Sequence, residues 1–396
     1  MAVPKIRFPG FTEDWEQRKL SGMATFSKGS GYSKADLKTS GKPIILYGRM
    51  YTKYETIIRN VDTFAEEKAG SVYSESGDVI VPASGETAQD ISRASVVANS
   101  GILLGGDINI IHPNNELNPG FLALTISNGN QQKKLSMKAQ GATIVHLHNE
   151  DLKGVDILCP SIDEQTLISE FFERIDNTIT LHQRKLESIK LLKKSLLQKM
   201  FPKSGETVPE VRFPGFTDAW EQRKFVDFAQ RESTLKLSCS DCPSVEYEDV
   251  IAEEGRLNKD IRQKEIQKTG IYFNGSQVLY GKLRPYLHNW LNPDFTGVAV
   301  GDWWVLRPSN MDKSFLYRLL QTDQFDAVAN QSSGSKMPRA DWKLVSNTEF
   351  IVPHSEKEQH KIAEFFNSID DLITLHQRKV EILHKLKKSL LQQMFV

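Results

Sequence analysis

The chain has 396 residues, 39% of them hydrophobic and 25% charged, and its lysines and arginines balance its aspartates and glutamates at 50 each. This composition is that of an ordinary globular protein with room for two or more domains, and the zero net charge excludes an overall basic field of the kind that attracts nucleic acid. No apolar run approaches the length of about 20 residues that crosses a membrane. We therefore expect a cytoplasmic protein without membrane contact.

The first predicted element belongs to a peptide that occurs twice. FPGFTEDWEQRKL at residues 8–20 returns as FPGFTDAWEQRKF at residues 213–225, which indicates an internal duplication. Pro9 and Gly10 predict a turn, and Thr12 can cap a short helix with acidic side chains in its first turn. We expect this helix to pack on a neighbouring domain through Trp15 and to do no chemistry.

Two segments that differ from each other follow the two copies of this peptide. They combine strand-like apolar runs with short helical ones, so each segment predicts an α/β globule. The strand-like runs are residues 42–47, 78–82 and 107–111 in the first segment and 277–280 and 298–306 in the second, where residues 314–320 have a helical pattern.

The three cysteines, Cys159, Cys239 and Cys242, give an odd number, which argues against a disulfide framework. Cys239 and Cys242 have the CxxC spacing of metal and redox sites, but no second pair or histidine cluster completes a zinc site. The spacing leaves both interpretations open and favours two ordinary thiols.

A longer repeat closes each half of the chain. EFFERIDNTITLHQRKLESIKLLKKSLLQKMF at residues 170–201 returns as EFFNSIDDLITLHQRKVEILHKLKKSLLQQMF at residues 364–395. Side chains spaced alternately by three and four positions form one mainly apolar stripe on each predicted helix, and such a stripe needs a partner helix. The residues expected at the helix contact are Ile175, Ile179, His182, Leu186, Ile189, Lys193, Leu196, Ile373, His376, Val380, Leu383, Lys387 and Leu390.

The two helices are expected to pack antiparallel. In a parallel pair in step, Lys193 would face Lys387 and His182 would face His376, which places like charges across a partly buried contact. The antiparallel register that we favour places His182 opposite Lys387 and Lys193 opposite His376. Every other seam position then lies opposite an apolar side chain.

The predicted fold class is α/β (α+β), with two domains in tandem joined by two long helices that form an antiparallel coiled coil. The duplication gives this arrangement an internal pseudo-two-fold. The expected boundaries are residues 1–158 for the first domain, 159–203 for the first helix region, 204–352 for the second domain and 353–396 for the second helix region.

Catalytic motifs are not found in the sequence. It contains no GxxxxGK[ST] phosphate loop, no GxSxG nucleophile elbow and no HExxH metal motif. The tetrapeptide at residues 292–295 is similar to the Asn-Pro-Pro-aromatic motif of adenine methyltransferases, but Asp294 replaces the second proline. We therefore expect no catalytic residue, metal or cofactor in this chain.

Clusters of basic, amide and aromatic side chains in both globules suit nucleic acid. Arginine can bridge guanine and glutamine can bridge adenine in the major groove, while lysine binds phosphate. The same mixtures also occur on ordinary surfaces. In the first globule the candidates are Arg49, Tyr51, Lys53 and Tyr54, with Gln131, Gln132 and Lys134 in an expected polar loop; in the second they are Lys282, Arg284, Tyr286, His288, Gln331, Ser333, Lys336 and Arg339.

The whole chain resembles the specificity subunits of type I restriction-modification systems. The resemblance rests on FPGF-x3-W-x2-R-K at the start of each half, on YGRMYTKY and YGKLRPYL, on Gly141 and Gly334 before the domain ends, and on the paired LHQRK helices. It implies two target-recognition domains that each read one half of a bipartite double-stranded DNA target. It also implies helices that space these domains and dock two modification subunits.

The resemblance places catalysis in partner subunits. Modification subunits transfer methyl groups from S-adenosylmethionine, and restriction subunits use ATP and Mg²⁺ for translocation and cleavage. The recognition domains differ between members, so no base-contacting residue is carried over. Two alternatives stay open: a tandem coiled-coil adaptor that binds proteins, and a DNA-modifying enzyme with an unrecognised site.

Overall fold

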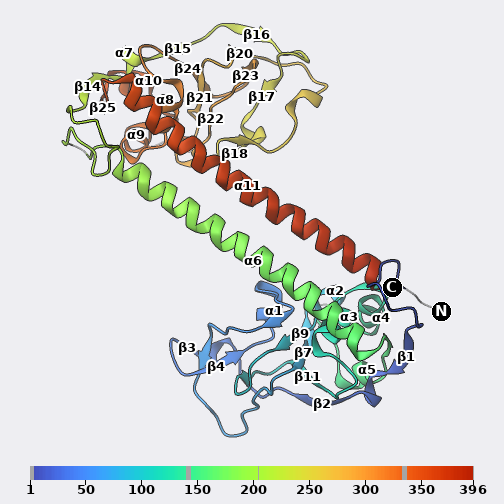
Figure 1. Ribbon diagram of the computed structural model, residues 1–396. Coiled ribbons are helices and arrows are strands. Elements are labelled where there is room, and N and C mark those ends of the chain that lie inside the picture. Colours follow the sequence, from blue (N-terminus) through green and yellow to red (C-terminus); the bar gives the residue numbers. More distant parts are fainter. Residues whose placement is uncertain (1–3, 140–143, 204, 332–336, 396) are drawn as a thin grey trace. The chain divides into compact units, whose positions relative to one another are not determined.

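The computed structural model describes residues 4–139, 144–203, 205–331 and 337–395 (Figure 1). The chain divides into two compact units, the first formed by Met1–Gln183 with Arg378–Val396 and the second by Arg184–Gln377. The long helices α6 (Ile162–Lys199) and α11 (Glu356–Met394) each contribute one part to each unit. Within the described ranges, no helix has the apolar run that membrane crossing requires.

A five-stranded sheet in the order β2-β11-β7-β9-β5 forms the centre of the first unit. Its strands are β2 (Ala24–Lys28), β5 (Ile57–Ile58), β7 (Asp78–Pro82), β9 (Ser95–Val97) and β11 (Ile108–Pro113). Strand β7 is buried along its whole length, and its side chains alternate between two cores: Val79 and Val81 enter one, and Ile80 enters the other. This two-sided burial explains the continuous apolar run in the sequence.

Smaller sheets and short helices complete the first unit. A four-stranded sheet has the order β10-β4-β6-β3, and β12 pairs with β8. The strands are β3 (Leu37–Lys38), β4 (Lys42–Ile45), β6 (Phe64–Ala65), β8 (Ser84–Gly85), β10 (Leu103–Leu104) and β12 (Val145–His146). The helices are η1 (Leu20–Gly22), η2 (Lys34–Asp36), α1 (Arg49–Thr52), α2 (Ala88–Ile91), α3 (Pro119–Ser127), α4 (Gly129–Lys138) and α5 (Asn149–Lys153).

Two four-stranded sheets form the second unit, in the orders β15-β24-β21-β22 and β16-β20-β23-β17, and β18 pairs with β19. The strands are β15 (Ala229–Glu232), β16 (Leu235–Leu237), β17 (Ser244–Val245), β18 (Val250–Ile251), β19 (Arg256–Leu257), β20 (Thr269–Phe273), β21 (Val278–Gly281), β22 (Trp290–Leu291), β23 (Gly297–Ala299) and β24 (Trp303–Pro308). Strand β21 alternates between two cores, as β7 does: Val278 and Tyr280 enter one, and Leu279 enters the other.

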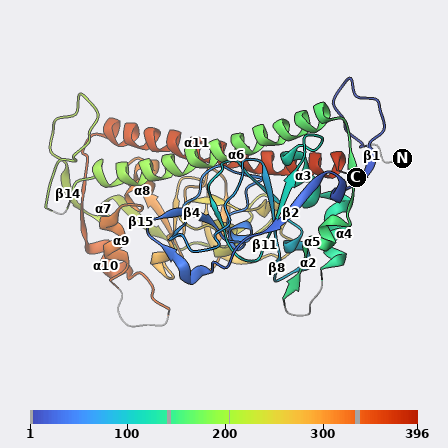
Figure 2. The same cartoon turned by 90° about the horizontal axis from the view of Figure 1, so that it is seen from below.

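The helices of the second unit are α7 (Phe225–Phe228), η3 (Tyr247–Asp249), η4 (Ile261–Gln263), η5 (Pro285–Leu287), α8 (Lys313–Leu319), α9 (Asp323–Ala329) and α10 (Trp342–Asn347). Figure 2 shows α8, α9 and α10 on the side of this unit that carries the beginning of α11. The run at 298–306, predicted as one strand, is two strands, because Gly301 adopts a φ of 100° and turns the chain between β23 and β24.

The duplicated peptide is not helical where a helix was predicted. Residues 8–15 form a turn and a loop, and the EQRK segment that follows is strand β1 (Glu16–Lys19), paired antiparallel with β13 (Asp156–Cys159). The second copy repeats this pairing with β14 (Glu221–Lys224) and β25 (Glu349–Val352). Backbone hydrogen bonds to a distant strand thus replace the local helix that the capping residue favoured.

An arginine and a buried glutamate fasten each copy of the peptide to the long helix that follows it. Arg7 donates two hydrogen bonds to Glu164 at 2.7 and 2.8 Å, and Arg212 donates two to Glu358 at 2.6 and 2.8 Å. The expected tryptophan anchor is also present, since Trp15 is buried in the core of the first unit. We call each combination of peptide, strand pair and arginine–glutamate pair a mount.

Within each unit the parts of α6 and α11 run antiparallel, as predicted. In the first unit Phe172 packs on Phe395 with ring centroids 6.1 Å apart, and further along α6 the Asp176 carboxylate accepts from Lys387 at 2.5 Å. Ile175 and Ile179 lie in the core that Leu383 and Leu390 cover. Gly129, with a φ of 64°, begins α4 against this end of α11, where a β-carbon would lie 2.4 Å from the Phe395 carbonyl oxygen.

The second unit repeats this contact with the helices exchanged. Lys193 of α6 lies 2.7 Å from Asp370 of α11. Leu186, Ile189 and Leu196 cover the core that contains Ile373. Of the remaining predicted contact residues, His376 is buried and Val380 and His182 are half-buried. Both seam lysines thus have an aspartate partner that was not foreseen, and their predicted pairing with the histidines stays a prediction.

Candidate nucleic-acid interface

Two loops meet beside strand β21 in the second unit. The Lys282 N–H donates to the Asp302 carbonyl at 2.9 Å, and the Lys282 carbonyl accepts from the Ala340 N–H at 2.8 Å. An isolated β-bridge joins Leu283 to Arg339. Backbone hydrogen bonds therefore place Lys282 beside Arg339, although the two lie far apart in the sequence.

The Asp302 carboxylate lies between these two cations. Arg339 donates to it from Nε and Nη2, the shortest bond being 3.0 Å, and Lys282 Nζ lies 3.4 Å away. The guanidinium of Arg339 lowers the pKa of Asp302. Half of the Arg339 side chain and 30% of the Lys282 side chain are exposed. Two accessible cations thus share one carboxylate, which leaves a positive excess that can bind phosphate.

A strained turn presents the next candidates. Arg284 and His288 flank η5 with φ values of 49° and 53°, a left-handed conformation that costs free energy in residues other than glycine. The Arg284 N–H donates to the Pro338 carbonyl at 2.7 Å, which fixes the turn, and Tyr286 is 52% exposed at its centre. The structure therefore places the exposed Tyr286 and the half-buried Arg284 beside Lys282.

The other second-unit candidates lie apart from this cluster or outside the described residues. The His288 ring lies between two carboxylates, 3.3 Å from Glu253 and 2.9 Å from Asp326, so both ring nitrogens have partners. Gln331 is exposed after α9. Ser333 and Lys336 fall outside the described residues, as do Gly141 and Gly334.

The first-unit cluster is neutralised by its neighbours. Arg49 begins α1 and donates to Glu55 at 2.8 Å and to Asp62 at 2.5 Å, with only 8% of its side chain exposed. Lys53 lies 2.8 Å from the same Asp62. Lys53 and Arg49 together lower the pKa of Asp62. The two cations are thus matched by two carboxylates.

The two tyrosines of this cluster are tied to the backbone. The Tyr51 hydroxyl donates to the Ser84 carbonyl at 2.6 Å, and the Tyr54 hydroxyl donates to the Ala94 carbonyl at 3.2 Å. Burial raises the pKa of both hydroxyls. Their rings are partly accessible, but their polar atoms are engaged within the unit.

The polar loop predicted around Gln131 is wrong, because these residues form helix α4. Gln131 is buried, and its amide donates to the Asp156 carbonyl, so it has no surface to offer to DNA. Gln132 donates to the Ser92 carbonyl at 3.3 Å. Lys134 is exposed on α4 and can still reach a ligand. A helical face with Leu135 turned inward was the signal in the sequence that the loop prediction overlooked.

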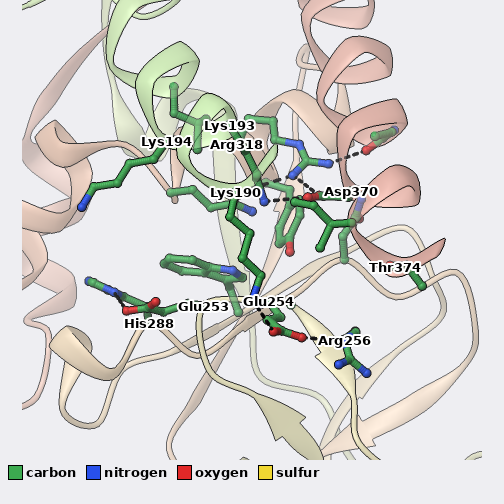
Figure 3. Close-up of a pocket in the computed structure, with 18 of the residues that line it drawn as sticks. Lys190, Lys193, Lys194, Glu253, Glu254, Arg256, His288, Arg318, Asp370 and Thr374 are labelled. Carbon is green, nitrogen blue, oxygen red and sulfur yellow. Dashed lines mark hydrogen bonds and ion pairs between the residues drawn. The ribbon is translucent and has the colours of Figure 1, made fainter. Parts of the chain in front are cut away.

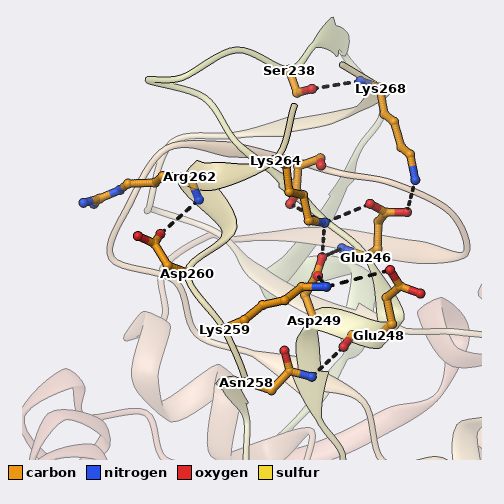
Figure 4. Close-up of polar contacts among 11 residues, drawn as sticks. Ser238, Glu246, Glu248, Asp249, Asn258, Lys259, Asp260, Arg262, Lys264 and Lys268 are labelled. Atoms are coloured by element: carbon orange, nitrogen blue, oxygen red, sulfur yellow. Dashed lines mark hydrogen bonds and ion pairs between the residues drawn. The ribbon is translucent and has the colours of Figure 1, made fainter. Parts of the chain in front are cut away.

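A second basic run, not singled out from the sequence, lies at residues 256–268 (Figure 4). Most of its cations are used internally. Lys264 donates to Glu246 at 2.8 Å and to the fully buried Asp249 at 2.5 Å, and Lys259 lies 3.0 Å from Asp249. Arg262 is exposed on η4, with its backbone bonded to Asp260. The lysines of this run therefore hold it against Glu246 and Asp249, and Arg262 is exposed on its surface.

No group of three or more histidine, cysteine, aspartate or glutamate side chains within the described ranges is arranged to hold a metal ion. Cys239 and Cys242 are free thiols that close a tight turn, since the N–H of each donates to the carbonyl of the other at 3.0 and 3.1 Å. The ordinary-thiol interpretation of the CxxC spacing agrees with this arrangement.

The chain is similar to specificity subunits of type I restriction enzymes. The Escherichia coli type I restriction enzyme EcoDI specificity subunit is 26% identical over 261 residues, which cover 58% of this chain and 58% of that subunit. The MjaVIII specificity subunit of Methanocaldococcus jannaschii is 21% identical over 405 residues, which cover 96% of this chain and 91% of that subunit.

Two solved structures share the fold. The S subunit of a type I restriction-modification system from M. genitalium superposes with a TM-score of 0.67 at 14% identity, and the match covers 100% of this chain and 99% of that one. A chain from a study of complex assembly in the type I R-M system gives a TM-score of 0.51 at 14% identity and covers 97% and 98% of the two chains. At these identities the likeness concerns the fold.

A family model described as the type I restriction modification DNA specificity domain matches residues 12–191 and again residues 218–385. Each match begins within one copy of the duplicated peptide and ends within one of the long helices. Because the two matches account for most of the sequence, this chain belongs to the family of type I restriction modification DNA specificity domains and carries two of them in tandem.

Proposed function

We propose that this chain is the DNA sequence-recognition subunit of a type I restriction-modification complex and that each unit reads one half of a bipartite target. The observation that carries the proposal is the tandem match of the specificity-domain model at residues 12–191 and 218–385. The duplicated mounts support it, because one chain with two attachment sites of the same design can present two different recognition surfaces to one duplex. The paired helices then space the two halves of the target.

The exposed cations of the second unit are assigned to the DNA backbone and bases. Lys282 and Arg339 have a positive excess over Asp302, which suits phosphate, and Arg284 and Tyr286 lie beside them on a fixed turn. Lys134 supplies an exposed cation in the first unit. The fixed backbone supports this assignment, because side chains that read base edges must extend from rigid positions.

Catalysis is assigned to partner subunits. Two modification subunits would dock on the helices and transfer methyl groups from S-adenosylmethionine, and restriction subunits would use ATP and Mg²⁺. The absence of phosphate-loop and nucleophile motifs from the sequence supports this division. The chain itself would select the sequence on which the partners act, in the cytoplasm where the DNA is.

An exchange of one recognition domain tests the proposal. Residues 21–155 are replaced by the equivalent segment of a relative, the complete system is expressed in a host, and the methylated sequence is mapped by long-read sequencing. One half of the target should change while the other half stays the same. A change in both halves, or in neither, contradicts separate readout by the two units.

The two alternatives give different results in simpler assays. A protein-binding adaptor would show no sequence preference when random duplex DNA is selected by mobility shift in the presence of its partners. An enzyme would transfer a labelled methyl group from S-adenosylmethionine to DNA as the purified chain alone, where we expect no transfer.

A further inference from the structure

A cavity of about 950 Å³ lies inside the second unit (Figure 3). One wall is the stretch of α6 from Glu187 to Gln198, the opposite wall belongs to α11, and the floor is the turn between β18 and β19 with part of α8. The α6 wall is roughly 16 Å long at about 1.5 Å per residue. An extended peptide of about five residues, at roughly 3.3 Å each, covers that length.

The charged side chains that line this cavity form a partly neutralised set with an acidic excess. Glu254 is shared by Lys190 and Arg256, and Asp370 is shared by Lys193 and Arg318. These pairs fix the walls and occupy four of the cations. Figure 3 shows them along both sides of the cavity.

Four further carboxylates have no cationic partner. Glu187, Asp294, Asp323 and Asp371 line the cavity and make no ion pair with any described residue, although Asp323 accepts a hydrogen bond from Gln198 at 2.9 Å. Lys194 is the one lining lysine or arginine that makes no ion pair with a described residue. All four are exposed, and together they leave an excess of negative charge beside the cavity, which attracts a cationic ligand. An occupant of this cavity is therefore expected to be basic.

Buried polar atoms give the second, independent indication. Trp290 is 7% exposed and Arg318 is 1% exposed, and both line the cavity; the indole Nε1 of the first and the Nε of the second have no hydrogen-bond partner within the described residues. The acceptors Asn292 Oδ1 and Gln377 Oε1, also in the lining, have none either. A buried polar atom left unpaired costs about 1–3 kcal/mol, so an occupant that pairs with these atoms is favoured.

The chemistry of these atoms separates the possible occupants. Three unpaired donors, Trp290 Nε1, Arg318 Nε and Gln321 Nε2, need acceptors, and two unpaired acceptors need donors. A polypeptide backbone offers both in every residue, because each amide carries one N–H and one C=O. A simple polyamine offers donors alone and would leave the Trp290 and Arg318 donors without a partner from the ligand.

We propose that this cavity binds an extended basic segment of a partner protein. Lysine or arginine side chains of the segment pair with Glu187 and Asp371, while its backbone amides bond to Trp290 and Gln377. The inference rests on the proposed function in that the segment belongs to a subunit that assembles with this chain. It adds a peptide-binding site to the second unit, whose lining includes His288 at the end of the turn that carries Arg284 and Tyr286.

The test uses the full chain and a fluorescent five-residue probe of alternating lysine and glycine, acetylated and amidated at its ends. Fluorescence anisotropy should show binding that the double change Glu187→Gln with Asp371→Asn weakens at least tenfold. The matched control, Glu170→Gln with Glu381→Gln, removes the same charge from exposed positions of the same helices outside the cavity and should bind as the unchanged chain does. Equal binding by the two double variants overturns the proposal.

Two further arms identify the occupant. Trp290→Phe keeps the ring and removes the Nε1 donor, so it should weaken peptide binding several-fold, while thermal unfolding of both variants shows that the second unit is intact. If spermidine displaces the probe at an equal concentration of positive charge and Trp290→Phe binds normally, the occupant is a small polycation and the peptide assignment is overturned.

The assembled complex supplies the last arm. With the partner subunits bound, the probe should no longer bind, because the natural segment fills the cavity; unchanged probe binding to the complex overturns the assignment to a partner. Probe binding is measured without DNA, whereas the proposed function is judged from the methylated sequence. Failure of one is therefore distinguishable from failure of the other.

Discussion

In the first unit Arg49 and Lys53 face two carboxylates, Glu55 and Asp62, whereas in the second unit Lys282 and Arg339 share the single carboxylate of Asp302. The mounts of the same two units are alike in their strand pairing and their bidentate arginine–glutamate pairs. The attachment has thus stayed the same in both copies, while the charge left free on the recognition surface differs.

The comparison teaches that a basic and aromatic cluster in a sequence does not by itself give a positive surface. What decides is how many carboxylates the fold brings within ion-pair distance. The second unit is therefore expected to contribute more phosphate contacts through its cluster than the first unit does through Arg49 and Lys53. Four further comparisons between the two units test this difference.

The largest effect is expected from the mounts. Glu358→Gln leaves the half-buried Arg212 without its carboxylate, and the one remaining acceptor oxygen must serve both Arg212 and Trp220 Nε1, which donates to Glu358 at 3.2 Å. The free energy of unfolding should fall by about 3–5 kcal/mol. Glu164→Gln should cost about 1 kcal/mol less, because Trp15 Nε1 has no bond to lose within the described residues.

Denaturant unfolding followed by tryptophan fluorescence measures both mount variants, with Glu170→Gln as the exposed control on the same helix as Glu164. If Glu164→Gln is the more destabilising of the two, the hydrogen bond from Trp220 does not account for the difference between the mounts.

The seam aspartates come next. Asp370→Asn removes the partner of both Lys193 and the buried Arg318, at 2.7 and 2.6 Å, and should cost about 3 kcal/mol. Asp176→Asn leaves only Lys387 without its carboxylate and should cost about 1–3 kcal/mol. The same unfolding experiment should therefore rank the two variants in this order, and equal losses would contradict it.

The pH dependence of Asp370→Asn adds a second readout. Burial lowers the pKa of Lys193, and the negative charge of Asp370 opposes that shift. Without the aspartate the folded-state pKa should fall further below that of the unfolded chain, so the unfolded state binds more protons between the two values. Part of the lost stability should accordingly return as the pH rises toward about 10.4, the ordinary value of lysine.

DNA binding should show the difference between the two clusters directly. Lys282→Ala should flatten the dependence of log K on log salt by about one unit of slope, as the loss of one phosphate contact does. Lys53→Ala should change the slope less, since Asp62 already neutralises that cation. A larger slope change for Lys53→Ala than for Lys282→Ala would reverse the comparison.

The smallest effect concerns thiol reactivity. Burial raises the pKa of Cys159 in the first unit to about 12, whereas Cys239 in the second unit is exposed. At pH 8 and without denaturant, iodoacetamide should label Cys239 rapidly and Cys159 only after unfolding. Peptide mass spectrometry of the labelled chain checks this, and rapid labelling of Cys159 would contradict its burial.

The parts of the fold that could be predicted from the sequence depend on local pattern or on repetition. The two long helices and their antiparallel contact followed from the mainly apolar stripe that both repeats carry. Strand β7 was predicted with both of its ends because its apolar run is continuous, in agreement with its burial along the whole length. The repeat peptide could not be predicted in the same way. Thr12 favours a helix locally, but strand β13, which pairs with this peptide, is far away in the sequence.

The sequence predicted which basic side chains lie at the candidate site, but not which carboxylates neutralise them. Lys282 and Arg339 were both named from the sequence, but Asp302, which joins them, is set by loops that pair only in the fold. Gln131 was predicted to lie in a loop because polar residues surround it, although Leu135, one helical turn later, indicates a buried helix face. Asp176 and Asp370 were missed because each lies nearly two helical turns from His182 or His376, the expected partners of the two lysines.

The first unit is interrupted along the chain by the whole of the second, since residues 184–377 lie between its two segments. During translation residues 184–377 are therefore synthesised before residues 378–396. Domains that begin nearer the N-terminus usually fold first as they emerge. Here the unit begun first lacks Met394 and Phe395, which close its core, until residues 378–396 have been added, so a chain truncated after Gln377 should hold a folded second unit beside an unfinished first.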